Sequence, residues 1–218
     1  MLTLTNVTAV IAGVQVLRGV SASIDVGTTV AVVGRNGAGK TTLLRAVMGL
    51  LPLRSGDMRL DGDPLASAPP HLRSRLGIGY APEDRILFPT FSVEDNLRFP
   101  CEVIGLKRAQ VDKRLDETID IVPELAELLP RSAAGLSGGQ GKMAALGRAL
   151  MVATKLVLLD EPFQGLAPVL AQRYAQALQR LQNKRPTLAV VVTESNAALL
   201  KNISTIRFTL ERGALAMT

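Results

Sequence analysis

A glycine-rich segment between an apolar run and a helical run most constrains how this chain can fold. Residues 30–33 are Val-Ala-Val-Val, which is typical of a buried strand, and residues 42–48 have the composition of a helix. Glycines at positions 34, 37 and 39 allow backbone angles and close approaches that a Cβ would prevent. Strand, tight loop and helix in this order predict a unit whose loop wraps around a ligand.

This segment has the full pattern G-x-x-x-x-G-K-T of a polyphosphate-binding loop. Its backbone amides and the N-terminus of the next helix attract an anion. Lys40 is expected to reach the β- and γ-phosphates of ATP, and the Thr41 hydroxyl to bind Mg²⁺. A glycine-rich turn without a ligand is the alternative, and the complete pattern argues against it. The expected nucleotide-binding residues are Gly34, Arg35, Asn36, Gly37, Ala38, Gly39, Lys40, Thr41 and Thr42.

Two further motifs follow in the second half of the chain. Residues 136–140 are Leu-Ser-Gly-Gly-Gln, and the apolar run 156–159 is followed by Asp160 and Glu161. Asp160 is placed to hold the hydration shell of Mg²⁺, and Glu161 to polarise an attacking water. A strand that ends in two solvated acids is the alternative, and the phosphate loop upstream makes it the weaker one. Glu161 and Lys40 are therefore the expected catalytic residues.

Composition limits the class of protein. A chain of 218 residues suits one α/β domain with a subdomain. Its apolar runs are shorter than a membrane span and its N-terminus lacks a signal-peptide pattern, so we expect a cytoplasmic location. The net charge of +6 comes from dispersed Lys and Arg, which does not by itself select a nucleic-acid partner. The single cysteine, Cys101, excludes an internal disulfide and is expected to fill apolar space.

The order of the predicted elements indicates an α/β fold with a mostly parallel sheet. Residues 2–10 and 14–24 predict an antiparallel edge sheet, residues 52–70 a turn-rich crossing and residues 78–80 a short strand. Helices are predicted at 93–97, 108–121 and 125–129, with breaks at Pro89, Pro100, Gly105, Pro123 and Pro130. A helix at 140–154, a strand at 156–159, a helix at 168–183 and a strand at 188–192 complete the core.

We therefore predict a P-loop NTPase (RecA-like) core with an N-terminal antiparallel β subdomain and an inserted α-helical subdomain. Residues 1–83 would form the β subdomain and the first part of the ATP-binding core. Residues 84–139 would form the helical subdomain, which ends in the Leu-Ser-Gly-Gly-Gln motif. Residues 140–218 would complete the ATP-binding core.

The order of phosphate loop, helical insert, Leu-Ser-Gly-Gly-Gln and Asp-Glu resembles the nucleotide-binding subunits of ATP-binding cassette (ABC) transporters over nearly the whole chain. In that family two subunits form a head-to-tail sandwich, and each ATP lies between one phosphate loop and the signature motif of the other subunit. The resemblance therefore implies that Ser137, Gly138, Gly139 and Gln140 bind the ATP of the partner. The Ser137 hydroxyl and the helix N-terminus would face its γ-phosphate. A simple helix cap fits the same residues locally.

Residues 77–83 and 161–168 are similar to the second ATP-binding subunit of branched-chain amino-acid importers, and urea and amide importers share this type of subunit. The resemblance implies membrane-spanning permease subunits, a solute-binding protein and a second cassette as partners. The second cassette can be a copy of this chain or a different subunit. It also implies a peripheral location on the inner face of the cell membrane.

Three positions depart from the common pattern of the resembled family. Ile11 stands where an aromatic side chain usually stacks on adenine, so base contact should be weaker. Glu83 replaces a common Gln of the lid loop and is expected to meet Mg²⁺ through water. Ser195 stands at the position of a switch histidine, and a Ser hydroxyl is shorter than imidazole and uncharged. The only histidine, His71, lies upstream of the lid loop and is expected to face solvent at a helix start.

These departures suggest unequal ATP sites. We hypothesise that the site built from Lys40, Asp160 and Glu161 hydrolyses ATP slowly, while residues 137–140 complete a more competent site on a different partner subunit. A regulatory subunit with little turnover is an alternative, which Ile11 and Ser195 favour and which the intact Lys40 and Glu161 oppose.

A soluble cassette that acts on DNA is a further alternative, but the insert is short, interrupted by prolines and poor in cysteine, so we expect no nucleic-acid partner. Three of the five phenylalanines, Phe88, Phe91 and Phe99, lie in one short stretch. They are either docking anchors for a permease or core residues of the helical subdomain.

Overall fold

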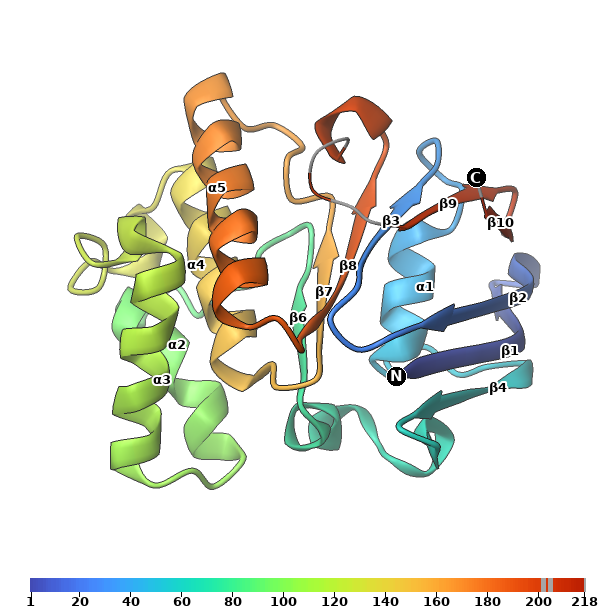
Figure 1. Cartoon of the computed structure of the whole chain (residues 1–218), viewed down its shortest axis with the longest axis horizontal. Helices are drawn as coiled ribbons and strands as arrows, with labels where there is room; N and C mark the ends of the chain where they lie inside the picture. The colour runs from blue at the N-terminus through green and yellow to red at the C-terminus, as the bar shows by residue number, and fades with distance from the viewer. Residues whose placement is uncertain (201–202, 204–205, 218) are drawn as a thin grey trace.

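A six-stranded, mostly parallel sheet forms the centre of the computed structural model (Figure 1). The structure describes residues 1–200, 203 and 206–217. The strand order is β10-β9-β3-β8-β7-β6, in which only β10 runs antiparallel to its neighbour. The strands are Thr29–Val33 (β3), Ile78–Ala81 (β6), Leu156–Asp160 (β7), Ala189–Glu194 (β8), Ile206–Glu211 (β9) and Ala214–Met217 (β10). Because the sheet is parallel, the carboxyl ends of β3, β6, β7 and β8 meet at one edge.

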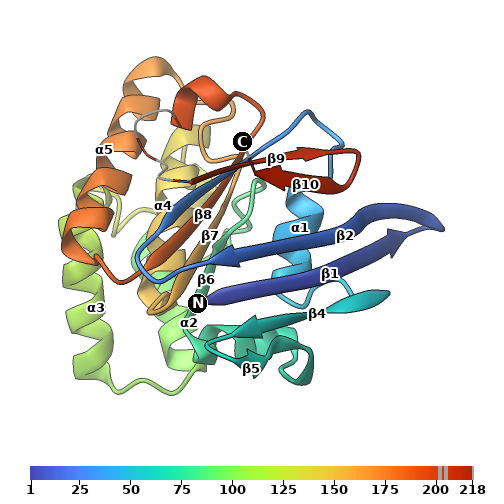
Figure 2. The same ribbon diagram turned by 45° about the vertical axis from the view of Figure 1, so that its right-hand side comes forward.

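An antiparallel sheet of four strands, β2-β1-β4-β5, lies beside the central sheet (Figure 2). Its strands are Leu2–Ile11 (β1), Val14–Ile24 (β2), Ser55–Leu60 (β4) and Asp63–Pro64 (β5). The predicted pair at the N-terminus is confirmed. The prediction of a turn-rich crossing at 52–70 was incomplete, because it missed β4, which pairs with β1 from Leu2↔Leu60 to Thr8↔Ser55. Gly56 within β4 and Gly62 just after it hide the short apolar alternation of the strand.

Helices cover both faces of the central sheet. The helix Lys40–Val47 (α1) lies on the face next to the antiparallel sheet, and Gly138–Val152 (α4) and Pro168–Lys184 (α5) lie on the other (Figure 1). Alternate residues of β7 therefore enter two different apolar clusters. Leu156 and Leu158 pack with α1, whereas Val157 and Leu159 pack with α4 and α5. This period of two is what a strand buried on both faces produces.

The inserted segment consists of two helices packed against α4, Val93–Val103 (α2) and Arg108–Ile121 (α3). Two predictions are wrong here. Pro100 does not break α2, which continues to Val103 because Leu97 and Cys101 are fully buried on either side of the proline. Residues 125–129 form turns after a 3₁₀ turn at Pro123–Leu125 (η3), because Pro123 and Pro130 leave too few residues for a stable helix.

Short 3₁₀ turns complete the connections, at Leu65–Ser67 (η1), Pro70–Leu76 (η2), Ala133–Gly135 (η4) and Ala197–Leu200 (η5). His71 is exposed near the start of η2, as predicted. Cys101 is a buried thiol that packs in the core of the helical segment, also as predicted.

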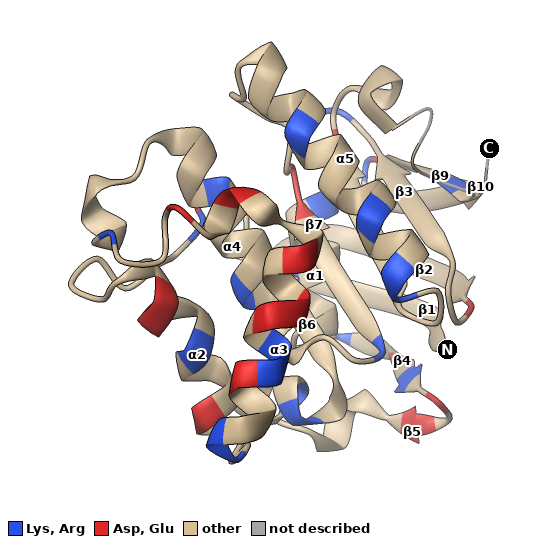
Figure 3. Cartoon of the chain, turned by 60° about the vertical axis from the view of Figure 1, so that its left-hand side comes forward, with Lys and Arg blue, Asp and Glu red and all other residues tan. Residues whose placement is uncertain are grey.

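Charged residues are spread over the surface of the helical side (Figure 3). Acids of α3 face basic residues at the end of α5, with Lys184 Nζ 2.7 Å from Asp120 Oδ2 and Arg185 Nη2 3.4 Å from Glu117 Oε2. Within the described ranges, none of the helices combines the length and the apolar character needed to cross a bilayer.

Candidate nucleotide-binding site

The loops that follow β3, β6 and β7 surround a cavity of about 380 Å³ at the carboxyl edge of the sheet. The cavity is lined by Ile11 and six residues of the predicted phosphate-binding segment, brought together from distant parts of the sequence. It lies where open α/β sheets bind their ligands. Its lining residues are Ile11, Val16, Asn36, Gly37, Gly39, Lys40, Thr41, Thr42, Glu83, Glu161 and Gln164.

The phosphate loop, residues 34–41, turns sharply between β3 and α1. Gly37 has φ of 80° and Gly39 has φ of 108°, which only glycine adopts without strain. A Cβ on Gly34 would lie 2.3 Å from the carbonyl oxygen of Leu210, so the glycine also permits close packing on β9. The loop thus leads directly into the N-terminus of α1, as expected for an anion-binding loop.

Lys40 is buried at the base of the loop. Its ammonium donates to the carbonyl oxygens of Gly34 at 2.6 Å and Arg35 at 3.1 Å, and lies 2.9 Å from Glu161 Oε1. These contacts place one cation between the phosphate loop and the expected catalytic acid. A phosphate oxygen in the cavity would add a charge-assisted bond to the same ammonium.

Asp160 is held by three hydroxyl groups. Thr193 Oγ1 donates at 2.7 Å and Thr41 Oγ1 at 3.2 Å to its Oδ1, and Tyr80 Oη donates to its Oδ2 at 3.3 Å. Burial raises the pKa of Asp160, and these hydrogen bonds act in the opposite direction. Thr193 and Tyr80 were not predicted, because nothing in their local sequence marks them as partners of an acid.

The residues fit a magnesium site. Mg²⁺ is usually bound through one or two protein oxygens, waters and substrate phosphates, and the Thr41 hydroxyl and Asp160 carboxylate lie 3.2 Å apart beside the phosphate loop. When bound there, Mg²⁺ would neutralise charge on the β- and γ-phosphates. Glu83 lies in the lid loop, residues 82–89, and lines the same cavity. Its pKa is raised, first by burial and then by Asp160 and Glu161.

Glu161 has an unusual backbone conformation. Its φ is 45°, in the left-handed region, and its N–H lies within hydrogen-bond distance of the carbonyl and hydroxyl oxygens of Thr193. The Ser195 hydroxyl and amide both donate to Glu161 Oε2 at 3.3 Å. The structure therefore brings Ser195, the expected switch position, into direct contact with the expected catalytic acid.

A second buried acid, Glu194, lies next to Glu161 and was missed by the sequence. Its Oε1 accepts from the Phe163 amide at 2.9 Å, and its side chain is almost fully buried. Burial raises the pKa of Glu194 to about 7, with a further contribution from Glu161. Lys142 of α4 lies close by and donates to the main-chain oxygen of Glu161. The side-by-side acids at 194 and 161 come from different strands, so no local pattern reveals them.

Ile11 lines the open end of the cavity with Val16 and is 44% exposed. Together they offer a small apolar surface where a base could lie. Val16 was not predicted. The alternation along β2 indicates that Val16 shares one face of the strand with Val14. It does not indicate that Val16 lies near Ile11 of the neighbouring strand.

The Leu-Ser-Gly-Gly-Gln signature, residues 136–140, lies outside this cavity. Ser137 caps α4, because its hydroxyl accepts from the Gln140 amide while Gln140 Oε1 accepts from the Ser137 amide. Ser137 and Gly138 are exposed, and Gly139 is buried against Leu170. The structure thus leaves the signature at the surface and does not bring it to Lys40 of the same chain.

Arginines connect the lid loop to the signature helix. Arg148 of α4 donates to the carbonyl oxygens of Arg85 at 3.2 Å and of Ile86, and Arg85 Nη1 donates to the Gly138 oxygen at 3.4 Å. Arg85 and Ile86 have φ of 67° and 41°, so this loop is held in a left-handed conformation.

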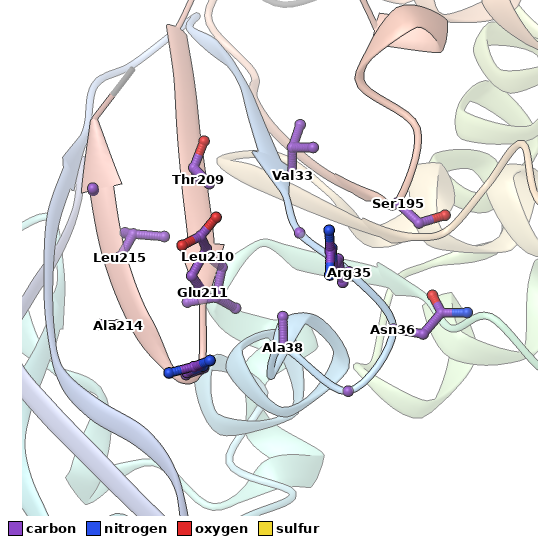
Figure 4. Close-up of a pocket in the computed structure, with 14 residues that line it drawn as sticks. Val33, Arg35, Asn36, Ala38, Ser195, Thr209, Leu210, Glu211, Ala214 and Leu215 are labelled. Carbon is purple, nitrogen blue, oxygen red and sulfur yellow. The ribbon is translucent and has the colours of Figure 1, made fainter.

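A second, larger hollow of about 1190 Å³ lies on the other side of the phosphate loop (Figure 4). Leu210 and Leu215 line it on the β9–β10 hairpin, and Arg35 and Ser195 line it on the opposite side. Arg35 and Ala38 border this hollow and are absent from the lining of the smaller cavity. The smaller cavity thus lies on one side of the phosphate loop, and the hollow beside the β9–β10 hairpin lies on the other.

Known proteins share both the motifs and the fold. The family model described as ABC transporter matches residues 17–164. The chain is 34% identical to the probable branched-chain amino acid transport ATP-binding protein LivF of Archaeoglobus fulgidus, over 93% of this chain and 84% of that protein. It is also 34% identical to the high-affinity branched-chain amino acid transport ATP-binding protein BraG of Pseudomonas aeruginosa, over 100% of this chain and 91% of that protein.

Similarity extends to other kinds of transporter. The chain is 33% identical to the lipopolysaccharide export system ATP-binding protein LptB of Escherichia coli K12, over 89% of this chain and 80% of that protein. Among solved structures, an ATP-binding subunit of an ABC transporter superposes with a TM-score of 0.86 at 26% identity, over 100% of this chain and 89% of that one.

Proposed function

Since this chain belongs to the ABC transporter family of ATP-binding proteins and is an ATPase, we propose that it powers the import of branched-chain or other amino acids. The observation that carries the proposal is the similarity to two branched-chain amino acid transport proteins over nearly the whole chain. The similarity to LptB means that a different cargo is an alternative. Urea and amides are further alternative cargoes.

The residues in and beside the cavity support separate roles in phosphate binding, Mg²⁺ binding and hydrolysis. Lys40 and the amides of the phosphate loop would bind the β- and γ-phosphates, with Mg²⁺ at Thr41 and Asp160 and with Glu83 reached through water. Glu161 would accept a proton from the water that attacks the γ-phosphorus, and ADP would leave with the electron pair of the broken bond. Ser195 would hold the Glu161 carboxylate. Glu161, Lys40 and Ser195 are thus the proposed catalytic residues.

Residues 137–140 would complete a neighbour's site in a head-to-tail dimer. The exposure of Ser137 and Gly138, and the separation of the motif from the cavity of the same chain, support this arrangement. The neighbour would be a different cassette with a more competent site, because this chain has Ile11 and Ser195 where larger groups are common. The test compares Glu161→Gln with the equivalent change in the partner, in a reconstituted transporter. Equal loss of turnover from both changes contradicts unequal sites.

A cluster of three aromatic rings supports docking to a permease. Phe88, Phe91 and Phe99 have ring centroids 5.2 to 5.7 Å apart, and Phe88 and Phe99 are 43% and 36% exposed. An exposed aromatic cluster is unusual on a surface without a partner and provides anchors for an apolar helix. Their position favours docking over the alternative of core packing. Peripheral attachment to the cytoplasmic face of the membrane would follow.

The cargo is tested by uptake. Cells that lack this gene should lose uptake of labelled leucine, isoleucine or valine, and the wild-type gene should restore it. The Glu161→Gln gene should restore part of the uptake, because the more competent site is proposed to belong to the partner. Loss of urea or amide uptake with unchanged leucine uptake contradicts the proposed cargo.

Docking is tested separately. Phe88→Ser combined with Phe99→Ser should leave ATP binding intact but remove co-purification with the permease.

A further inference from the structure

A lysine of the signature helix reaches the proposed catalytic acid. Lys142 lies two residues after Gln140 on α4, and its ammonium donates to the main-chain oxygen of Glu161 at 2.5 Å. The Gln164 amide donates to the same oxygen at 3.2 Å. Lys142 is half-buried, and its ammonium loses part of its hydration where it bonds to this oxygen.

The surroundings of Lys142 explain its place. Burial lowers the pKa of Lys142, the carboxylates of Glu194, Glu83 and Glu161 act in the opposite direction, and Arg85 adds to the lowering. Glu194 and Glu161 have only 1% and 4% of their surface exposed. Neighbouring carboxylates that are shielded from water repel one another when both are ionised. A cation beside them reduces that repulsion.

The backbone of Glu161 also needs support. A non-glycine residue in the left-handed region is strained, typically by about 1 kcal/mol, and persists only where its surroundings hold it. Pro162 follows, which disfavours the right-handed helical conformation for Glu161. Lys142 donates to the carbonyl oxygen of Glu161, and the Glu161 amide donates to the Thr193 hydroxyl, so both sides of the residue are held.

We propose that Lys142 is a positioning residue for Glu161 and supplies the positive charge that the hydroxyl of Ser195 cannot. It holds the main chain of Glu161 while Ser195 and Lys40 hold the carboxylate. Because Lys142 is part of α4, the position of the signature helix then sets how well Glu161 is oriented. The inference rests on the proposed role of Glu161.

The test measures ATP turnover of the full chain at saturating ATP and Mg²⁺. Lys142→Met and Lys142→Gln should each lower kcat about tenfold or more, with the KM for ATP within about twofold of wild type. Lys142→Arg should keep at least about a third of kcat, because the charge and a donor remain. Lys113→Met is the matched control, since Lys113 is a solvent-exposed lysine of α3, and kcat should not change.

A second-site change separates charge from structure. Ser195→His should raise kcat by a factor at least about threefold larger in the Lys142→Met background than in the wild-type chain, because imidazole then replaces a cationic group that Glu161 has lost. An equal gain in the two backgrounds, or Lys142→Arg as impaired as Lys142→Met with a raised KM, overturns the proposal. If Glu161→Gln leaves turnover unchanged, the proposed role of Glu161 fails and this inference fails with it.

If the chain alone hydrolyses no ATP, urea unfolding tests the role of Lys142 instead. Lys142→Met should lower the free energy of unfolding in the wild-type chain, and less so in the Glu194→Gln chain, because the acid that the lysine offsets is then neutral. A double-mutant cycle measures the coupling. Additive effects of the two changes overturn the proposal.

Discussion

At the scale of single residues, we propose that the contact between Ser195 and Glu161 limits turnover. The hydroxyl reaches only one carboxylate oxygen, at 3.3 Å. It donates one proton and carries no charge, so it cannot bridge the acid and a γ-phosphate as a cationic ring does.

Ser195→His should therefore raise kcat about tenfold, which corresponds to about 1.4 kcal/mol at the transition state. Ser195→Ala, as control, should lower kcat only about twofold to threefold. Phosphate release from the full chain at saturating ATP measures both. No gain from histidine would mean that Ser195 does not limit the reaction.

Ile11→Phe should strengthen ATP binding about threefold to tenfold, because a stacked aromatic pair adds roughly 0.5–1.5 kcal/mol. Binding of inorganic triphosphate should not change, since it has no base. Val14→Phe is the control, because Val14 is exposed in the same hairpin and does not line the cavity. Calorimetric titration distinguishes the two ligands. Equal gains for triphosphate and ATP would contradict stacking.

Glu194 should make stability depend on pH. Its pKa is raised in the folded chain from 4.5 to about 7, so the folded state binds its proton more tightly than the unfolded state does. Its stabilising contribution is complete below about pH 4.5 and is lost as the pH rises through about 7. Urea unfolding of Glu194→Gln should show a smaller fall in stability across this window than wild type. Parallel curves would contradict the shift.

At the scale of elements, the close contact of β6 with α4 is what joins the sheet to the signature helix. A Cβ on Gly79 would lie 2.2 Å from the Ala149 oxygen and 2.9 Å from Ala153 Cβ. Neither neighbour is the flexible end of a side chain, so strand or helix would have to shift.

Gly79→Ala should consequently destabilise the chain by about 3 kcal/mol. Gly135→Ala is the control, because a Cβ there meets no atom within 4 Å, and its effect should stay within about 0.5 kcal/mol. Chemical denaturation with circular dichroism measures both. Similar stability of the two variants would contradict the packing argument.

The elements also show how far the sequence determines the fold. The predicted helix at 168–183 is confirmed as α5, because its apolar spacing and its N-terminal proline act locally. The persistence of α2 through Pro100 was not predictable, because burial against α4 outweighs a local helix-breaking tendency. The strand β4 was missed since its pairing with β1 is a long-range contact.

The candidate site divides in the same way. Motifs located Lys40, Thr41, Asp160 and Glu161, because their chemistry requires fixed spacing along the chain. Lys142 and Glu194 were missed because they meet Glu161 only through the packing of α4 and β8 around it. Spacing within a motif is visible in a sequence, whereas contact between motifs is a property of the fold.

At the scale of the whole molecule, the two apolar clusters share one sheet. Core residues of α2 and α3 belong to the same cluster as residues of α4, β7 and β8. The helical segment therefore buries its apolar face against elements outside its own stretch of sequence.

A fragment of residues 84–139 alone should remain unfolded, since it lacks Met143, Leu146 and Leu150 of α4, which are buried in that shared cluster. The full chain should unfold in one transition, with equal calorimetric and van't Hoff enthalpies. Circular dichroism of the fragment and calorimetry of the chain test this. A folded fragment would make the segment an independent domain.

The arginine contacts between the lid loop and α4 have a thermodynamic consequence. Glu83 in that loop lines this chain's own cavity, while Gly138, which Arg85 contacts, belongs to the motif proposed to serve the neighbour's ATP. In the proposed dimer, binding at one cavity would then change affinity at the other, and linkage would make the change equal in both directions. A slowly hydrolysing ATP site in this chain would thus act as an allosteric effector site. Its occupancy by ATP, rather than its hydrolysis of ATP, would affect the neighbour.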